Sequence, residues 1–182
     1  RIGRDRFMRN VEDAMLTLKD YLIEYGKTHR NPVNQRIHFV CVPAIFVSTL
    51  GLGWLLNLEL LGVDAPWAAW INAATVGGAL ILALFYARLG LRVSLWMIAW
   101  FLIAVALILA VEASPVPLWA AAGSVWIAAW IVQLIGHSIE GAKPSFVDDL
   151  VFLLIGPLFV LEELGVPLLE SAARRDRGQA AG

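Results

Sequence analysis

The sequence predicts an all-α, multi-pass membrane protein, and three observations lead to this fold class. Hydrophobic residues make up 59% of the 182 residues and charged residues 16%, whereas soluble domains are about 45–50% apolar and about 25% charged. Four apolar runs are each long enough to cross a hydrocarbon core about 30 Å thick. The basic residues gather at alternate ends of these runs, as the loop charges of membrane proteins do.

Residues 6–25 predict an amphipathic helix ahead of the first span. Apolar residues recur there at three- and four-residue steps and charged residues fill the gaps, which is the pattern of one apolar helical stripe. The stripe consists of Phe7, Val11, Met15, Leu18, Leu22 and Tyr25. We expect this helix to lie on the membrane surface or to pack against the rest of the protein.

The four spanning helices are predicted at residues 37–56, 67–87, 93–112 and 116–136. The link at 57–66 contains acidic but no basic residues, whereas Arg88 and Arg92 lie between the second and third spans. Basic residues also precede the first span, and Lys143 follows the fourth. Because basic loops stay on the cytoplasmic side, the N-terminus is predicted to be cytoplasmic.

A fifth hydrophobic segment, "FVDDLVFLLIGPLFVLEELGVPLL", is predicted to be broken or re-entrant. Its clean apolar stretch, residues 150–161, is too short to cross comfortably, and Pro157 removes a backbone donor in its middle. A true fifth span is the alternative. We therefore divide the chain into an N-terminal cytoplasmic segment (1–36), a membrane-embedded domain (37–165) and a flexible basic tail (166–182).

This topology predicts that all three histidines of the chain lie at one membrane level. His29 and His38 are at the cytoplasmic mouth of the first span, and His137 is at the cytoplasmic end of the fourth. Lysine and arginine alone set the topology, so the agreement among the histidines is independent support for a shared site.

Polar neighbours of these histidines suggest a metal site. Gln133 and Glu140 lie on the same helical face as His137. Non-haem Fe(II) oxygenases typically bind iron with two histidines and one carboxylate, which leaves positions open for substrate and oxygen. Three imidazoles and Glu140 suit iron and would also suit zinc.

Each of these polar residues also has a structural interpretation. Asn31 and Asn34 flank Pro32 and either form a turn or orient a ligand histidine through a hydrogen bond. Glu140 either binds the metal or pairs with Lys143. Cys41, the only cysteine, is expected to be a small buried apolar residue.

Two sequence blocks resemble the Mpo1-like family. They are "YGKTHRNPVNQRIHFVCVP" and "WIVQLIGHSIEGAKPSFVDDLVFLLIGPLFVLEE", and their order, their spacing and the spans between them also match. The resemblance covers roughly residues 20–165. Cys41 stands where the family pattern has a glycine.

The resemblance implies an Fe(II)-dependent dioxygenase of 2-hydroxy fatty acids, which shortens the acyl chain by one carbon in fatty acid α-oxidation. It implies that His29, His38 and His137 are the catalytic, metal-binding residues, with Glu140 as a fourth ligand and Fe(2+) as cofactor. Asn31, Asn34, Gln133 and Lys143 would support the ligands or hold the substrate. A 2-hydroxy acid can chelate iron, and its acyl tail favours a membrane-embedded site. The membrane would be a bacterial inner membrane or the endoplasmic reticulum.

Other function classes are less well supported by the sequence. The net charge of −1 argues against a nucleic-acid partner, which a basic surface would indicate. A different metal-dependent membrane enzyme acting on lipid remains an alternative, as does a small scaffold or transporter. The second and third spans carry no ionisable residue in their interiors, which disfavours a transporter.

Overall fold

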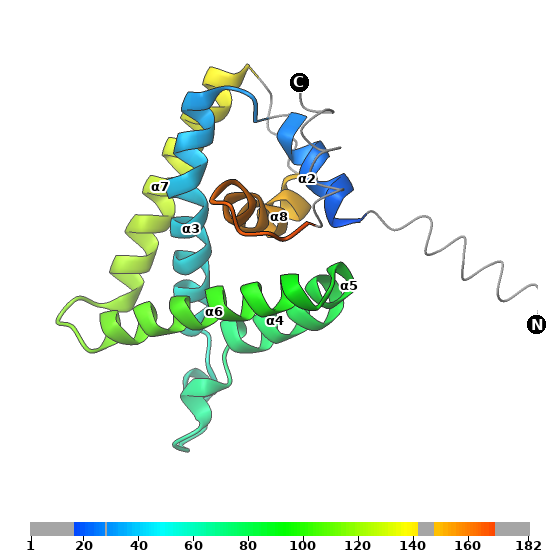
Figure 1. Cartoon of the computed structure of the whole chain (residues 1–182). Helices are drawn as coiled ribbons and strands as arrows, with labels where there is room; N and C mark the ends of the chain where they lie inside the picture. The colour runs from blue at the N-terminus through cyan, green and yellow to red at the C-terminus, as the bar shows by residue number, and fades with distance from the viewer. Residues whose placement is uncertain (1–16, 28, 142–147, 170–182) are drawn as a thin grey trace, which may run out of the picture.

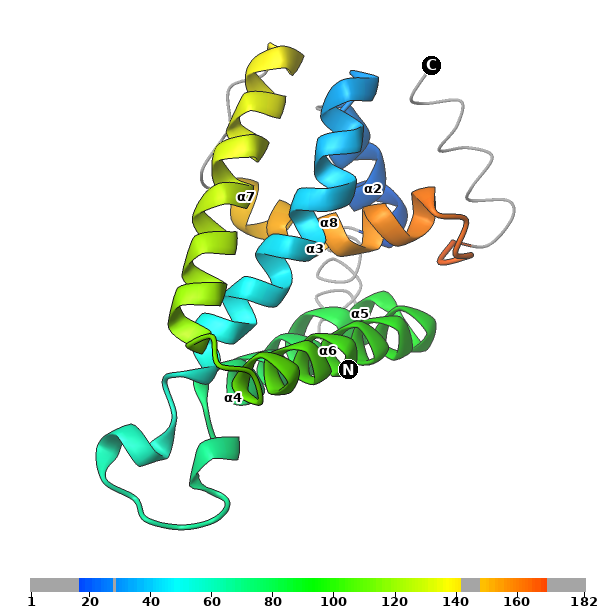
Figure 2. The same cartoon turned by 90° about the vertical axis from the view of Figure 1, so that its left-hand side faces the viewer.

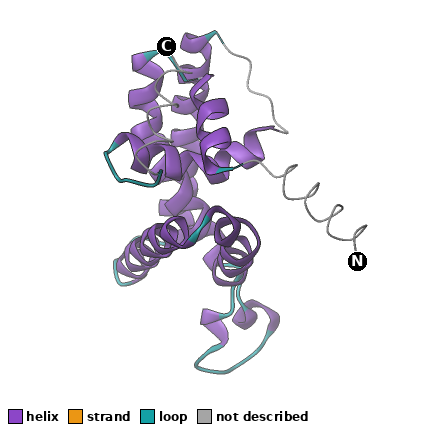
Figure 3. Ribbon diagram, turned by 45° about the vertical axis from the view of Figure 1, so that its right-hand side comes forward, coloured by secondary structure: helices purple, strands orange, loops and turns teal. Residues whose placement is uncertain are grey.

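The structure is a computed structural model that describes residues 17–27, 29–141 and 148–169 (Figure 1). Within these ranges the chain is helical and contains no β-strand (Figure 3). The α-helices are α2 (Leu18–Lys27), α3 (Pro32–Trp54), α4 (Ala73–Ile81), α5 (Ala87–Leu89), α6 (Leu91–Glu112), α7 (Leu118–Glu140) and α8 (Asp148–Glu163). Two 3-10 turns, η1 (Leu58–Leu61) and η2 (Ala68–Trp70), and the π-helical segment η3 (Leu82–Tyr86) complete the description.

The central feature is an antiparallel pair formed by α3 and α7, which lie side by side in both views (Figures 1 and 2). At one end of the pair Gly51 packs against Ala122, and at the other Gly136 packs against Asn34 and Ile37. Small residues let two helix backbones approach closely. Of the three membrane-length helices in the described residues, the first and the last are thereby joined along their lengths.

A second hairpin crosses this pair. It runs through α4, η3 and α5 and returns through α6, and Gly90 at its turn has a φ of 115° that favours glycine. Figures 1 and 2 show it running steeply across one end of α3 and α7. Helix α8 packs against both α2 and α3 and lies between them in Figure 1. This arrangement places α2, α3, α7 and α8 around the end of the molecule that carries the histidines.

Among the residues that the structure describes, three helices are long and apolar enough to cross a membrane: α3, α6 and α7. Large apolar side chains stay exposed on the last two, for example Leu102 (60%) and Ile127 (56%). Many large exposed apolar side chains are typical of a surface that contacts lipid or a partner. The chain is therefore a helical membrane protein by length, composition and surface.

The predicted count of four spanning helices is not confirmed. The segment predicted to span at 67–87 is a shorter apolar helix, covering residues 73–89, that starts late. The reason is Asn72, whose side chain accepts a hydrogen bond from Thr75 N while Thr75 Oγ1 accepts one from Asn72 N. This capping box begins the helix at Ala73, and residues 68–70 form a 3-10 turn instead.

The other two predicted segments are described in part. Of the N-terminal amphipathic helix, α2 is present and buries Leu18, Leu22 and Tyr25 of the predicted stripe, and residues 1–16 lie outside the described residues. The fifth hydrophobic segment contains α8, which is 16 residues long and continues through Pro157. Its entry into a membrane stays a prediction.

We predict that Asn72→Ala lowers the free energy of unfolding by about 1 kcal/mol, because the substitution removes the helix cap of α4. Thermal unfolding in detergent measures the change. Asn72→Ser keeps a capping oxygen and is expected to retain most of the stability. Equal melting temperatures for wild type and the alanine variant would contradict this role.

Candidate metal centre

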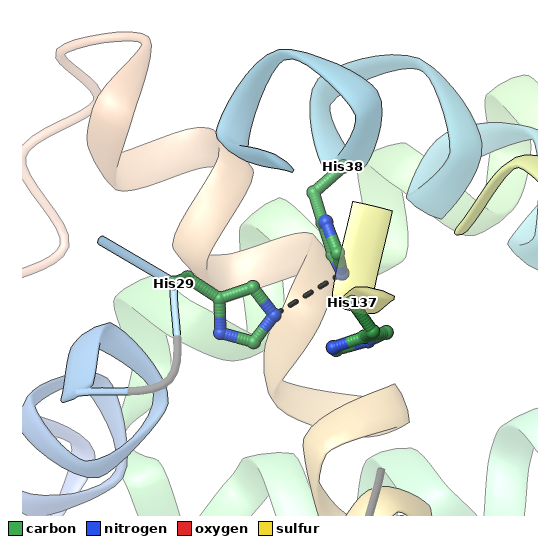
Figure 4. Close-up of side chains that lie close together, drawn as sticks. All are labelled: His29, His38 and His137. Carbon is green, nitrogen blue, oxygen red and sulfur yellow. Dashed lines mark hydrogen bonds between the residues drawn. The ribbon is translucent and has the colours of Figure 1, made fainter. Parts of the chain in front are cut away.

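Three histidines from three separate elements converge at one end of the α3–α7 pair (Figure 4). His29 comes from the link between α2 and α3, His38 from α3 and His137 from α7. One nitrogen from each ring lies within 4.8 Å of the others. His29 and His38 are only 4% and 1% exposed. The sequence predicts this convergence, and the structure places the three rings together.

Backbone carbonyls determine which nitrogen of two of these rings carries the hydrogen. His29 Nδ1 lies 2.7 Å from the carbonyl oxygen of Tyr25, and His38 Nδ1 lies 2.9 Å from that of Asn34. A carbonyl oxygen can only accept, so both Nδ1 atoms donate. In a neutral imidazole the other nitrogen, Nε2, then carries a lone pair and no hydrogen. Metal-binding histidines are typically oriented in this way.

The two Nε2 atoms face each other at 3.1 Å (Figure 4). For this contact to be a hydrogen bond, one ring would have to be protonated on both nitrogens. Burial opposes that state, since it lowers the pKa of His29 to about 4. At neutral pH the His29 ring is therefore neutral, and the burial of His38, which is 1% exposed, likewise disfavours its charged form. Two lone pairs then point at each other, an arrangement that a cation stabilises.

This donor set fits a divalent transition metal. Imidazole ligands suit iron, zinc, copper and nickel. Nitrogen ligands lie about 2.0–2.1 Å from such an ion, so neighbouring ligands on one ion are about 3.0–3.4 Å apart. The spacing between the Nε2 atoms of His29 and His38 falls in this range. In the described part of the chain, the group that could hold an ion consists of the three histidines.

Glu140 joins the elements that carry the histidines. Its carboxylate accepts hydrogen bonds from the backbone N–H groups of Arg30 (2.9 Å) and Asn31 (2.9 Å) and from Asn34 Nδ2 (3.1 Å). Both oxygens are engaged at the start of α3, where the helix dipole favours negative charge. These contacts make Glu140 a positioning residue that connects the end of α7 to the His29 link. Its role as a fourth ligand stays a prediction.

The remaining predicted site residues have different surroundings. Asn31 caps α3, because its side chain accepts a hydrogen bond from Val33 N. Asn34 is fully buried and bonds Glu140, while Gln133 is buried on the face of α7 that packs on α3. Lys143 lies outside the described residues. Cys41 is a buried residue of an apolar cluster, as expected.

Sequence reasoning missed two residues that position the ligands. The ring of Tyr25 stacks on that of His29 with centroids 4.0 Å apart and planes 2° apart. A Cβ added to Gly136 would collide with Asn34 Oδ1, so the glycine permits the close approach beside His137. Tyr25 lies four residues before His29, as Asn34 does before His38, and this shared spacing is a signal that could have revealed the carbonyl contacts.

Fold and site together define a helical membrane protein with a cluster of three histidines, two buried and one half-buried, that is suited to a divalent metal. A family model described as "2-hydroxy-palmitic acid dioxygenase Mpo1-like" matches residues 15–167, a range that includes all three histidines. The chain therefore belongs to the Mpo1-like family. No curated protein and no solved structure matches it.

We predict that Gly136→Ala lowers the metal content of the purified protein at least severalfold, because the added methyl group forces Asn34 and α3 away from α7. Metal content is measured by elemental analysis. Gly123→Ala on the same helix is the matched control, since a Cβ there meets nothing within 4 Å. Equal metal content in the two variants would show that the close approach at Gly136 does not matter for the site.

We predict that Glu140→Gln weakens metal binding, because an amide presents its own N–H donors to three groups that are themselves donors. The loss of a charge-assisted bond at a partly buried position corresponds to about 1.5–3 kcal/mol, or about a tenfold or greater rise in the dissociation constant. A competitive chelator titration measures it. The control is Glu112→Gln, at the exposed end of α6, which is expected to match wild type.

Proposed function

We propose that this protein is an Fe(II)-dependent dioxygenase that acts on 2-hydroxy fatty acids and shortens them by one carbon. The family description supports the substrate class and the type of reaction. The observation that carries the proposal is the pair of buried imidazoles whose Nε2 atoms face each other at 3.1 Å. With His137 they form a donor set suited to ferrous iron.

In this proposal the chain's own residues hold and orient the reactants. His29, His38 and His137 bind the ion, and the carbonyls of Tyr25 and Asn34 keep the two Nε2 lone pairs directed at it. Glu140 holds the His29 link against α7. When bound, ferrous iron supplies the redox chemistry that lets O2 react with an organic substrate.

The reaction balances without another reductant. A 2-hydroxy acid, RCH(OH)COOH, and O2 give the shortened acid RCOOH together with CO2 and H2O. The C1–C2 bond breaks, C1 leaves as CO2 and C2 becomes the new carboxyl carbon. The substrate supplies all four electrons that reduce O2, so the site has to accommodate only the hydroxy acid and oxygen.

A membrane setting suits an acyl substrate. The histidine cluster lies beside α3 and α7, two of the helices that are apolar enough to cross a membrane, and each buried CH2 group contributes about 0.8 kcal/mol. We propose that the N-terminus and the histidines face the cytoplasm, in a bacterial inner membrane or the endoplasmic reticulum. We further propose the division into segments 1–36, 37–165 and 166–182.

The proposal predicts that protein purified under anaerobic conditions contains iron and consumes O2 when 2-hydroxypalmitate is added. His29→Ala, His38→Ala and His137→Ala should each lose most of the iron and reduce oxygen consumption at least about a hundredfold, since each removes a ligand. Elemental analysis and an oxygen electrode provide the measurements. Ser124→Ala, at an exposed position on α7, is the control.

Two outcomes would contradict the proposed function. One is full oxygen consumption by His29→Ala. The other is a wild-type protein that binds zinc tightly and hydrolyses a lipid without consuming oxygen, which would favour a different metal-dependent lipid enzyme.

A further inference from the structure

Gln133 is a buried polar side chain that the site described so far does not use. It is only 8% exposed, and its Oε1 atom has no hydrogen-bond partner among the described residues. Buried polar atoms are nearly always hydrogen-bonded, and each exception calls for an explanation. A ligand that donates a hydrogen bond would satisfy this oxygen.

Asn34 Oδ1 also has no partner, but its position is explained by packing. The other half of the Asn34 amide donates to Glu140, and Oδ1 lies against the backbone at Gly136. Trp130 Nε1 is a further buried atom without a partner, but an indole N–H is a donor and cannot accept. Gln133 Oε1 is thus a buried acceptor on α7 whose missing partner neither packing nor its chemistry explains.

The neighbours of Gln133 along α7 locate it at a polar-to-apolar boundary. Gly136, nearer the histidines, packs against Asn34 and Ile37 of α3. Ala129, one turn in the other direction, belongs to an apolar cluster with Cys41 and Ile45. Because α3 and α7 are antiparallel, Gln133 lies between these two layers. It also lies one turn from His137 on the same face.

A 2-hydroxy fatty acid also changes from polar to apolar along its length, as the surroundings of Gln133 do. Its carboxylate and hydroxyl occupy C1 and C2, and the chain is apolar from C3 onward. A carboxylate bound at the histidines would leave the 2-hydroxyl one bond further along the substrate, and Gln133 lies one turn of α7 from His137. The orphan Oε1 is an acceptor, and a hydroxyl is a donor.

We propose that Gln133 accepts a hydrogen bond from the 2-hydroxyl group of the substrate and makes the site select hydroxylated over unsubstituted fatty acids. This inference rests on the proposed function and adds the residue that determines its specificity. An acid without the hydroxyl leaves Oε1 buried and unpaired. Sites built to bond a hydroxyl reject analogues that lack it for this reason.

A double-mutant cycle tests the contact. Anaerobic, iron-loaded protein in nanodiscs is titrated with 2-hydroxypalmitate and with 2-fluoropalmitate, which is similar in size but has no hydroxyl hydrogen. We expect wild type to bind the hydroxy acid about 10- to 100-fold more tightly. Gln133→Met has a similar volume and no acceptor amide. It should reduce the preference to its square root or less, for example from about 100-fold to about 10-fold. Ser124→Ala should leave it unchanged.

The outcomes separate this inference from the proposed function. If wild type prefers 2-hydroxypalmitate and Gln133→Met prefers it equally, the assignment of Gln133 is wrong and the function stands. If wild type shows no preference, the proposed substrate is wrong and the inference fails with it. Should Gln133→Met not retain iron, Gln133→Glu keeps acceptor oxygens and is expected to retain the preference, and loss of the preference in that folded variant would overturn the inference.

Discussion

The contact between the Nε2 atoms of His29 and His38 is the constraint on which the site depends. Each ring is oriented by a backbone carbonyl four residues earlier, from Tyr25 and from Asn34, so neither can rotate without losing a buried hydrogen bond. Two lone pairs are thereby held together inside the protein. The surrounding structure holds these two lone pairs close together, which is unfavourable unless a cation lies between them. In this sense the centre is preorganised for a metal ion.

The long helices alone do not build this centre. His29 belongs to a link rather than to a helix, so its place depends on contacts from several directions. Tyr25 stacks on its ring, Gln35 donates a hydrogen bond to its carbonyl oxygen (2.8 Å), and Glu140 holds the next two backbone N–H groups. The closeness of α3 and α7 at Gly136 then lets His137 approach the other two. Both helix packing and hydrogen bonds are therefore needed to position the three histidines.

Much of this could be predicted from the sequence, because composition and charge report directly on membrane insertion. The helical class, α3, α6, α7 and the grouping of three histidines follow from hydropathy, basic residues and position. The late start of α4 was missed because residues 67–71 are apolar and extend the hydropathy signal, while the Asn72 cap decides the helix start. The contacts of Glu140 could not be predicted from the sequence either. They join residues about 110 positions apart, and no local pattern encodes which backbone groups a carboxylate will meet.

The distribution of the ligands along the chain has a consequence for how the protein is made. His29 and His38 are synthesised early, whereas His137 is near the end of α7, the last of the described helices that are long enough to cross a membrane. Joining α3 to α7 closes a loop of roughly one hundred residues, which costs about 4 kcal/mol of chain entropy. The nascent chain therefore carries His29 and His38 before His137 is available, and the cluster of three histidines is complete only after α7 has docked. An ion that binds all three rings, as proposed above, would then bind only to chains in which α3 and α7 have paired.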